Sequence, residues 1–556
     1  NVTEILEELR TKHSLLPFQQ RLVGDKRTAL LILLGATAIL LLIACANVTN
    51  LLLSQASIRM REMALREVLG ATRARIVRQL LVESTMLAFV GAALGVALAP
   101  AALTLINRLM PPALIGLAPA RVDLRVLGFA VALALATGIV FGLWPALGTS
   151  RSAPDAVIKS GSSHGSTAGK LGRGRRLLVA AELSLTIVLL VGAGLMLRSF
   201  RHVMGLDAGM STARVATLEL SFRSMPPPER MRRLDDIVAA AALTPGVAAV
   251  GLVNDLPLRG GGGISVTVDV PNAPKKEMMF ARLLMASPGY FDALGIRLID
   301  GRNFTARDDS LAPKVMIISE SMAKEFWPGV NPIGRTINAM PGKAGATVIG
   351  IAADVRETSL EREPGSQMYF PIAQQTPGNV AIVARGTLPP AQLLASLARA
   401  VRSADRSQAV YNAKMMDEVV DASVAPRKTN LLLITIFAGV ALALSALGVY
   451  AVVAYGVAQR GRELGIRAAL GAGAGNLMTL VAGELMWVSI LGIVAGLGGA
   501  WALSKLVSSM LYGISPHDPA TYALVPLALL LPAAVAAIIP AHRASQVDPA
   551  IILRND

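Results

Sequence analysis

The chain has 556 residues, of which 53% are hydrophobic and only 16% are charged, and its mean hydropathy is +0.55. Soluble domains carry about 25% charged residues, so this balance excludes an ordinary soluble protein and favours a chain that crosses a membrane several times. The net charge of +16 first indicates basic loops on the cytoplasmic side, not nucleic-acid binding. The single cysteine, Cys45, excludes an intrachain disulfide.

Seven stretches stay apolar for about 20 residues, the length that a helix needs to cross a bilayer. They cover residues 28–53, 83–106, 126–147, 177–197, 431–457, 478–503 and 521–541. We expect no acidic or basic side chain in the middle of any of these spans. Ion-coupled transporters need such groups inside the membrane, so this expectation argues against a secondary transporter.

Arginine and lysine gather in the loops that follow the first, third and fifth spans, whereas the loop 506–519 has none. Because basic loops stay in the cytoplasm, we expect these three loops and the C-terminus to be cytoplasmic. The N-terminus and residues 200–430 then lie outside. No basic region followed by a short apolar core and a cleavage site opens the chain, so no signal peptide is predicted.

The external stretch is predicted to be a folded α+β domain. Its β-rich runs are 213–222, 264–270, 314–319, 346–355 and 380–386, and its helical patterns are 228–243, 319–327 and 390–404. Proline and glycine clusters separate these elements, as expected for turns. The glycine run 260–263 is interpreted as a loop, because no strand-to-helix context makes it a phosphate cradle.

A short motif occurs twice, each time between apolar spans. "REMALREVLGA" begins at Arg61, and "RELGIRAALGA" begins 401 residues later at Arg462. At the same offset, the pair Gly91 and Gly95 matches the pair Gly492 and Gly496, and each pair forms Gly-x-x-x-Gly, a close helix-packing device in membranes. The chain therefore contains two copies of one three-span unit in the same orientation.

The repeat predicts the order of domains. Residues 28–159 form the first three-span unit and 429–556 the second, while 160–176 form a cytoplasmic linker, 177–199 the opening span of the second unit and 200–428 its external domain. By this symmetry the first unit lacks its opening span and most of an external domain. Residues 1–27, which are polar and amphipathic, are interpreted as the tail of that missing domain.

Each motif is predicted to form a short amphipathic helix at the inner membrane surface. An acidic residue precedes an arginine by four positions in both copies, a favourable helical pair, and a glycine follows at the helix end. These residues are Arg61, Glu62, Arg66 and Gly70, and Arg462, Glu463, Arg467 and Gly471. On the residues alone, such a helix either anchors the topology or binds a partner. Glu83 and Glu484 are interpreted as charges that stabilise the next helix N-terminus.

The motif Arg-Glu-x-x-x-Arg-x-x-Leu-Gly-Ala between spans resembles that of the FtsX-like permease family, whose best-known branch is the MacB-type ABC transporter. The external segment resembles the MacB-like periplasmic core domain over residues 285–309, 315–337 and 348–371. Two units in one chain resemble the duplicated orphan permeases described as acidobacterial. Those have eight spans and two external domains, so the resemblance implies an N-terminally truncated sequence.

The resemblance implies a multi-pass permease subunit of the bacterial inner membrane. Its two motifs are implied to be coupling helices that dock on a separate cytosolic ABC ATPase. ATP hydrolysis there moves the periplasmic domain, which acts on an adaptor or on a hydrophobic or peptide-like substrate for export or extraction. The duplicated halves form a pseudo-dimer, or the chain forms a homo-dimer. The alternative, a non-transporting regulator or scaffold acting on a periplasmic partner, stays open.

No catalytic, cofactor or metal site and no nucleic-acid partner are predicted. The nearest approach to a phosphate loop is "GSSHGSTAGKL" (161–171), in which His164 occupies the position that requires glycine and Leu171 the position that requires serine or threonine. We therefore expect no ATPase domain in this chain. The five histidines are scattered over both predicted sides of the membrane.

Overall fold

The computed structural model describes residues 27–58, 66, 69, 72–109, 123–150, 167–222, 224–259, 263–268, 279–338, 345–459, 467, 470 and 474–545. The chain divides into two compact units. Residues 1–202 and 427–556 form the first, here called the helical unit, and residues 203–426 form the second, here called the sheet domain.

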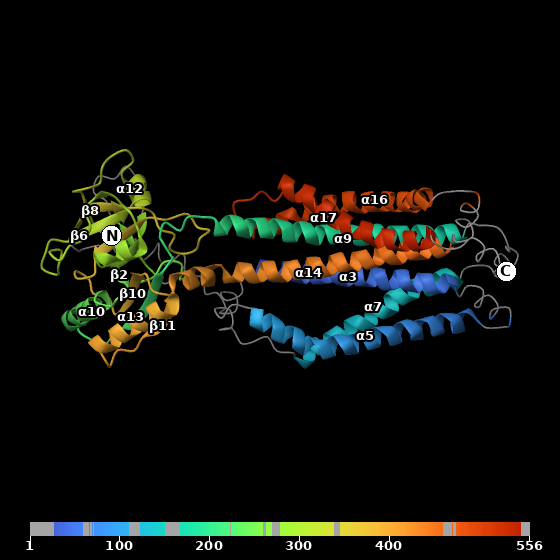
Figure 1. Ribbon diagram of the computed structural model, residues 1–556, viewed down its shortest axis with the longest axis horizontal. Coiled ribbons are helices and arrows are strands. Elements are labelled where there is room, and N and C mark those ends of the chain that lie inside the picture. The colour runs from blue at the N-terminus through green and yellow to red at the C-terminus, as the bar shows by residue number, and fades with distance from the viewer. Residues whose placement is uncertain are drawn as a thin grey trace, which may run out of the picture. The chain divides into compact units, whose positions relative to one another are not determined.

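Long helices form the helical unit, and each predicted span falls within one of them (Figure 1). They are α3 (Arg27–Ile58), α5 (Arg73–Leu109), α7 (Leu124–Ser150), α9 (Thr167–Met204), α14 (Met416–Gln459), α16 (Ala474–Ser508) and α17 (Pro519–Ser545). Among the described residues, six of these helices are long and apolar enough to cross a membrane, while the apolar segment Leu124–Val140 of α7 is shorter. The prediction of a polytopic helical membrane protein is confirmed.

Helix α9 provides much of the buried core of the helical unit. Its Leu183 and Ile187 are almost fully buried in a cluster that includes Val449 of α14 and Leu529 of α17. On another side, Leu189 of α9 packs with Ile43 of α3. Helix α9, the predicted opening span of the second copy, therefore contacts helices from both copies of the repeat.

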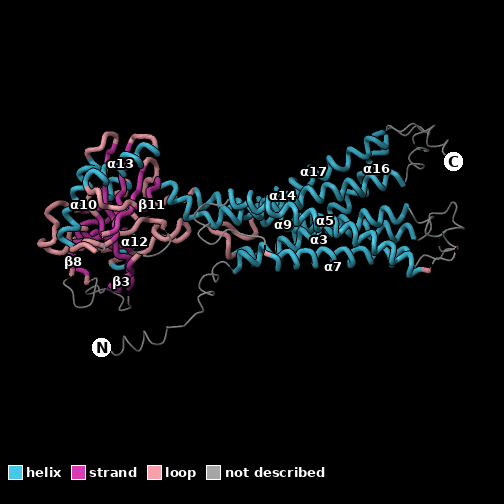
Figure 2. The backbone as a smooth tube through the Cα atoms, turned by 90° about the horizontal axis from the view of Figure 1, so that it is seen from below, coloured by secondary structure: helices cyan, strands magenta, loops and turns pink. Residues whose placement is uncertain are grey.

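The sheet domain contains an 11-stranded sheet, and all strands among the described residues belong to it (Figure 2). The strands are β1 (Val215–Ser221), β2 (Val247–Val253), β3 (Ile264–Val268), β4 (Met279–Ala286), β5 (Leu298–Gly301), β6 (Val315–Ser319), β7 (Thr336–Ile337), β8 (Ala346–Ala352), β9 (Gln367–Pro371), β10 (Asn379–Gly386) and β11 (Tyr411–Met415). Their order is β11-β1-β10-β2-β4-β9-β6-β8-β5, with β3 paired to β4 and β7 paired to β8. Among the described strands, β4–β9 and β6–β8 pair in parallel and the other pairs are antiparallel.

Four helices accompany the sheet: α10 (Pro227–Ala242), α11 (Gly289–Leu294), α12 (Glu320–Phe326) and α13 (Pro390–Ala404). Proline at the first turn starts α10 and α13, and the Ser319 side chain accepts a hydrogen bond from the Met322 N–H at the start of α12. Leu234 of α10 and Leu397 of α13 are fully buried in the core against the sheet. The predicted α+β domain is confirmed, including all five predicted strands and three predicted helices.

Strand β2 and helix α11 approach so closely that one glycine is required. A Cβ at Gly251 would lie 2.3 Å from the backbone nitrogen of Tyr290. Any side chain here would push α11 off the sheet, and with it the buried rings of Tyr290 and Phe291.

Candidate functional site

Four residues of the repeated motifs lie within the described part of the chain: Arg66, Leu69, Arg467 and Leu470. The other predicted coupling residues, Arg61, Glu62, Gly70, Arg462, Glu463 and Gly471, lie outside it. Leu69 is 81% exposed and Leu470 is 82% exposed, although both are large apolar side chains. They occupy the same position in the two copies, so the chain presents the same apolar residue twice.

The first motif is connected to the helix that follows it. Arg66 Nη1 donates to Gln79 Oε1 at 3.1 Å, and Gln79 Nε2 donates to Glu83 Oε1 at 3.2 Å. Gln79 and Glu83 belong to α5, so this chain of hydrogen bonds joins the motif to the beginning of that span. Glu83 is expected to stabilise the N-terminus of this helix, but α5 begins at Arg73, about three turns earlier, so that interpretation is wrong; Glu83 instead holds the glutamine that binds the motif arginine. Glu484 likewise lies well inside α16, which begins at Ala474.

The two Gly-x-x-x-Gly pairs differ in their surroundings. A Cβ at Gly492 would lie 2.8 Å from the Ala180 carbonyl oxygen, and one at Gly496 would lie 2.7 Å from Ile187 Cβ, so α16 packs closely on α9. The same packing is expected of Gly91 and Gly95, but a Cβ at either would meet no atom within 4 Å. No described helix covers this face of α5, so close packing at Gly91 and Gly95 stays a prediction.

A buried acid lies inside the membrane-spanning part of α9, which corrects the expectation of spans free of acidic groups. Glu182 is within the candidate span Gly174–Met204 and is 1% exposed. Asn47 of α3 donates from Nδ2 to Glu182 Oε1 at 2.8 Å and to the Leu444 carbonyl oxygen of α14 at 3.0 Å. The spans therefore do not speak against an ion-coupled transporter.

The repeat makes the surroundings of Glu182 asymmetric. Gly448 of α14 occupies the position that Asn47 occupies in α3, and a Cβ there would lie 2.4 Å from Glu182 Oε2 and 2.5 Å from Asn47 Oδ1. One turn away, the hydroxyls of Thr186 and Ser445 are 2.5 Å apart and buried. The first copy thus supplies the Asn47 amide, and the second copy supplies Gly448, which leaves room for the Glu182 carboxyl group. Glu182 of α9 therefore contacts both α3 and α14.

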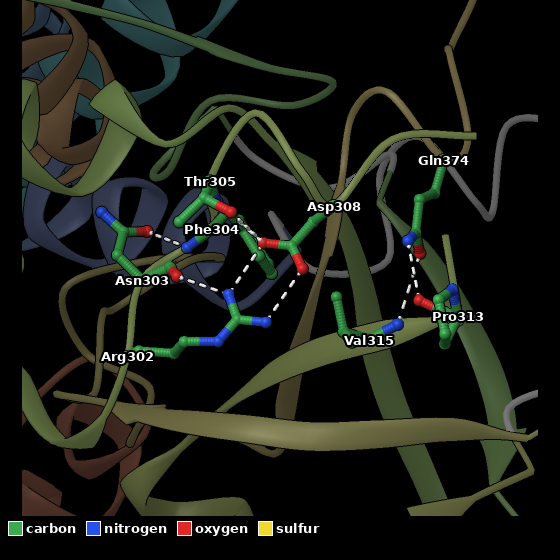
Figure 3. A network of polar contacts seen from close by, with 8 residues as sticks. All are labelled: Arg302, Asn303, Phe304, Thr305, Asp308, Pro313, Val315 and Gln374. Atoms are coloured by element: carbon green, nitrogen blue, oxygen red, sulfur yellow. Dashed lines mark hydrogen bonds and ion pairs between the residues drawn. The ribbon is translucent and has the colours of Figure 1, made fainter. Parts of the chain in front are cut away.

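A bidentate ion pair fixes the loop after β5 in the sheet domain (Figure 3). Arg302 Nη1 lies 2.8 Å from Asp308 Oδ2, and Nη2 lies 2.9 Å from Oδ1. The Arg302 guanidinium and the hydrogen bonds from Thr305 lower the pKa of Asp308 to about 2. In the same view, Gln374 donates to the Pro313 carbonyl oxygen at 3.0 Å and accepts from the Val315 N–H at 3.3 Å.

A second acid is buried in the sheet domain. Burial raises the pKa of Glu357 to about 8, although the Arg282 guanidinium, 3.6 Å away, lowers it. Arg282 Nη2 makes its closer ion pair with Asp255, at 2.6 Å. Neither Glu357 side-chain oxygen has a hydrogen-bond partner among the described residues, so the neutral acid is the form that burial favours.

The sheet domain also has a cleft of about 880 Å³, where β1 and β2 end and β10 and β11 begin. Glu219 and Arg259 form an ion pair of 2.8 Å in its wall, and Ile264 and Tyr411 add exposed apolar surface. Such a mixed lining suits a ligand that has both polar and apolar groups. Within the described part of the chain, no three metal-binding side chains come together.

Comparison with known families matches both units. The model described as FtsX-like permease C-terminal matches residues 34–154 and again 435–549, and the MacB-like periplasmic core domain matches residues 183–407. The chain is an FtsX-like permease with a MacB-like periplasmic core domain. The double match confirms the duplicated unit.

Relatives of the permease are ABC transporter proteins. An uncharacterized ABC transporter permease, YknZ of Bacillus subtilis, is 26% identical over 48% of this chain and 68% of YknZ. The macrolide export ATP-binding/permease protein MacB of an Azoarcus species is 24% identical over 46% of this chain. The chain spans 40% of the length of that MacB, which is named as an ATP-binding and permease protein.

Solved structures resemble the sheet domain weakly. The periplasmic region of MacB from Actinobacillus actinomycetemcomitans covers 38% of this chain and 94% of its own, with 18% identity and a TM-score of 0.27. The extracellular domain of YknZ covers 35% of this chain with 22% identity and a TM-score of 0.24.

Sequence reasoning missed two features of the permease that its own patterns contained. The leucine of Leu-Gly-Ala is identical in both motifs, which was a signal for Leu69 and Leu470. Glu182 stands within the predicted span 177–197 and was visible as a charge in an apolar run. Its partner Asn47, 135 residues earlier, is known only from the fold.

Proposed function

We propose that the permease couples ATP hydrolysis on a separate cytosolic ABC subunit to movement of its periplasmic domain. The result is export or extraction of a hydrophobic or peptide-like substrate. This proposal also places the two motifs and the C-terminus in the cytoplasm, as the basic loops indicate.

The observation that carries the proposal is the matched pair Leu69 and Leu470. Each of these apolar side chains is about four-fifths exposed on a turn between spans, so most of its surface is available to a partner. Two of them at equivalent positions suit a partner with two similar binding surfaces, such as a pair of ATPase subunits or domains. Arg66 and Arg467 lie three residues before these leucines and add matched positive charge.

Coupling also needs a connection from the motif to a span. The hydrogen bonds from Arg66 to Gln79 and from Gln79 to Glu83 supply one in the first copy. A displacement of the motif would therefore pull on the first turns of α5, which is how a docked partner would act on the membrane helices.

The cleft of the sheet domain supports a ligand or adaptor outside the membrane. Its Glu219–Arg259 ion pair and its Tyr411 side chain offer polar and apolar contacts together, as a peptide-like molecule requires. A purely apolar ligand would cover the Glu219–Arg259 ion pair and remove it from water without offering it a hydrogen bond, which costs free energy.

One observation also favours the rival function, a non-transporting regulator. Two polar side chains inside the helical unit, Thr186 of α9 and Ser445 of α14, are in direct contact, with their hydroxyls 2.5 Å apart. Such a contact joins two helices, as a unit that transmits movement requires, whether or not a substrate is conducted. The rival differs from the proposal in having no transported molecule, and it can keep the same ATPase.

Purification from native membranes tests the proposal. We expect an ABC ATPase to co-purify with the wild-type chain and to be lost from the double variant Leu69→Glu, Leu470→Glu, because each glutamate places a charge in an apolar contact. The matched control is Leu124→Glu, which changes another highly exposed leucine outside the motifs. Retention of the ATPase by the double variant would reject these leucines as its docking points, and absence of any ATPase from well-folded wild type would reject the powered permease.

A further inference from the structure

Three charged or titratable side chains lie in a row at the wall of the cleft in the sheet domain. Asp255, which follows β2, lines the cleft, and Arg282 of β4 pairs with it, with Nη2 2.6 Å from Asp255 Oδ2. Arg282 also faces Glu357, whose Oε2 lies 3.6 Å from Nε. The side chains of Asp255 and Arg282 are 17% and 14% exposed, and that of Glu357 is 4% exposed. Asp255 is therefore the member of the row that a ligand in the cleft can reach.

The contact between Arg282 and Glu357 is incomplete. Glu357 Oε1, Glu357 Oε2 and Arg282 Nε are buried, and none of these atoms has a hydrogen-bond partner among the described residues. A hydrogen bond of about 2.9 Å would need the 3.6 Å between Nε and Oε2 to close by about 0.7 Å. Arg282 thus pairs closely with Asp255 and has a second acid within reach.

The backbone on both sides of this arginine is held in place. The Leu258 N–H donates to the Glu357 carbonyl oxygen at 2.7 Å, and the Asn254 N–H donates to the Met285 carbonyl oxygen at 3.1 Å. Asn254 Oδ1 in turn accepts from the Met285 N–H at 2.8 Å. The loop after β2 is therefore tied to β4 and to the segment that carries Glu357, so a small shift of the guanidinium needs no rearrangement of the chain.

A cation bound to Asp255 would change which form of Glu357 is favoured. Without it, Asp255 and Arg282 neutralise each other, and burial favours the neutral acid of Glu357. The other titratable side chains that interact with Glu357 are Tyr290 of α11 and Tyr369 of β9, and burial raises the pKa of both phenols, so both stay neutral. A cation on Asp255 would leave the Arg282 charge without its counterion, and the Glu357 carboxylate would replace it.

We infer that Asp255 binds an alkylammonium group, such as that of a lysine side chain, in the cleft, and that Glu357 gives up its proton to the solvent when this group binds. The ligand cation takes the place of Arg282 at Asp255, and the guanidinium then pairs with the Glu357 carboxylate. The charge balances, since one cation enters the site and one proton leaves it. Exposed Ile264 and Tyr411 offer a surface to the apolar part of the ligand. The inference deepens the ligand site of the proposed function and requires no ATPase.

Glu219, the other acid that lines the cleft, lacks this arrangement. It pairs with Arg259 at 2.8 Å and accepts a hydrogen bond from Asn412 Nδ2 at 3.2 Å. The Arg259 side chain is 49% exposed, so water can solvate its charge when the pair opens. A cation bound to Glu219 would release Arg259 to the solvent and would displace no proton from a buried acid.

Isothermal titration calorimetry of the full-length chain in detergent micelles tests the inference. The probe is a Leu-Lys-Leu tripeptide, acetylated and amidated so that the lysine ammonium is its only charge. The reference is the same peptide with norleucine in place of lysine. Titrations in buffers of different ionisation enthalpy count the protons released.

We expect about one proton per bound lysine peptide at about pH 7, because Glu357, with a pKa of about 8, is mostly protonated there. Because binding releases a proton, the affinity should rise as the pH increases towards 8, by up to about tenfold per pH unit. The norleucine peptide should bind more weakly and release no proton.

Variants identify the groups involved. Asp255→Asn should weaken binding of the lysine peptide by at least about tenfold, because a charged hydrogen bond is lost. Glu357→Gln should bind the peptide without proton release and without the pH dependence. Glu219→Gln, the matched control, removes a charge from the same cleft, but binding should still release about one proton.

A further variant protects the test against misfolding. Arg282→Gln frees Asp255 from its competitor, so the lysine peptide should bind several-fold more tightly and release no proton. Misfolding cannot produce a gain of affinity. Weaker binding by this variant would contradict competition between Arg282 and the ligand.

Three results would overturn the cation site and leave the cleft as a peptide site: the same proton release with the norleucine peptide, full affinity in Asp255→Asn, or proton release that persists in Glu357→Gln. Failure of the wild type to bind either peptide would overturn both the cation site and the role proposed for the cleft. Co-purification of an ATPase is unaffected by any of these results, so the powered permease is tested separately.

Discussion

Glu182 is held by one side-chain donor, Asn47, among the described residues. Its other carboxyl oxygen, Oε2, is buried without a hydrogen-bond partner there. We predict that Asn47→Ala lowers the free energy of unfolding of the helical unit by about 1 kcal/mol, the usual size of a hydrogen bond between membrane helices. Denaturation in mixed micelles measures the change.

Glu182→Gln is the matched control for that loss. It keeps the shape of the side chain and retains an oxygen that accepts from Asn47, so we expect a smaller effect than that of Asn47→Ala. Equal stability of Asn47→Ala and the wild type would contradict a structural role for the contact.

The buried carboxyl group of Glu357 predicts that the free energy of unfolding of the sheet domain depends on pH. Its pKa is about 8 in the folded protein and about 4.5 when unfolded, so the folded state binds the extra proton between these values. The stabilisation is complete below about pH 4.5 and is lost as the pH rises towards 8, with a slope of at most about 1.4 kcal/mol per pH unit. Hydrogen exchange of the β4 amides measures this loss of stability.

Glu357→Gln should flatten this slope, because the amide does not titrate. Asp308 cannot produce it, since its pKa of about 2 places its own loss of stability at acid pH. An unchanged slope in Glu357→Gln would show that another group titrates.

At the scale of elements, the glycine pairs allow a paired comparison. Gly496→Leu drives a side chain into α9, where a Cβ alone would already lie 2.7 Å from Ile187 Cβ, so we predict a loss of about 1–3 kcal/mol from overpacking. Gly95→Leu, at the equivalent position of α5, should leave stability nearly unchanged. Thermal unfolding of both variants measures the difference, and equal losses would contradict the different packing of the two copies.

The elements that were predicted well from the sequence are those that consist of one continuous apolar run. The spans and the strands β6 and β10 are continuous apolar runs, and they were predicted within a few residues. Strand β11, "YNAKM", is mostly exposed and polar, so no alternation marks it. Its membership of the sheet comes from pairing with β1, some 200 residues away along the chain.

The candidate sites were predictable only in part for the same reason. Repeat comparison identified the motifs and both glycine pairs, because they are patterns within the chain. The neighbours that make the pairs different, α9 in one copy and none described in the other, depend on how helices pack. The cluster of Glu357, Arg282 and Asp255 likewise joins residues from three separate segments, and their spacing along the chain does not predict the contact.

At the scale of the whole molecule, the proposed function requires that Leu69 and Leu470, at equivalent positions of the two copies, bind the same cytoplasmic partner. Single-cysteine variants Leu69→Cys and Leu470→Cys, each in a Cys45→Ser chain, can be labelled with a membrane-impermeant maleimide in inside-out vesicles. The measurement compares labelling rates in native vesicles with rates after peripheral proteins are stripped away.

The account predicts slow labelling at both positions in native vesicles and fast labelling at both after stripping, because a docked ATPase covers the two leucines. Leu124→Cys, predicted to lie on the other side of the membrane, should stay unlabelled throughout. Equal and fast labelling of positions 69 and 470 before and after stripping would contradict the account, since nothing would then cover the motifs.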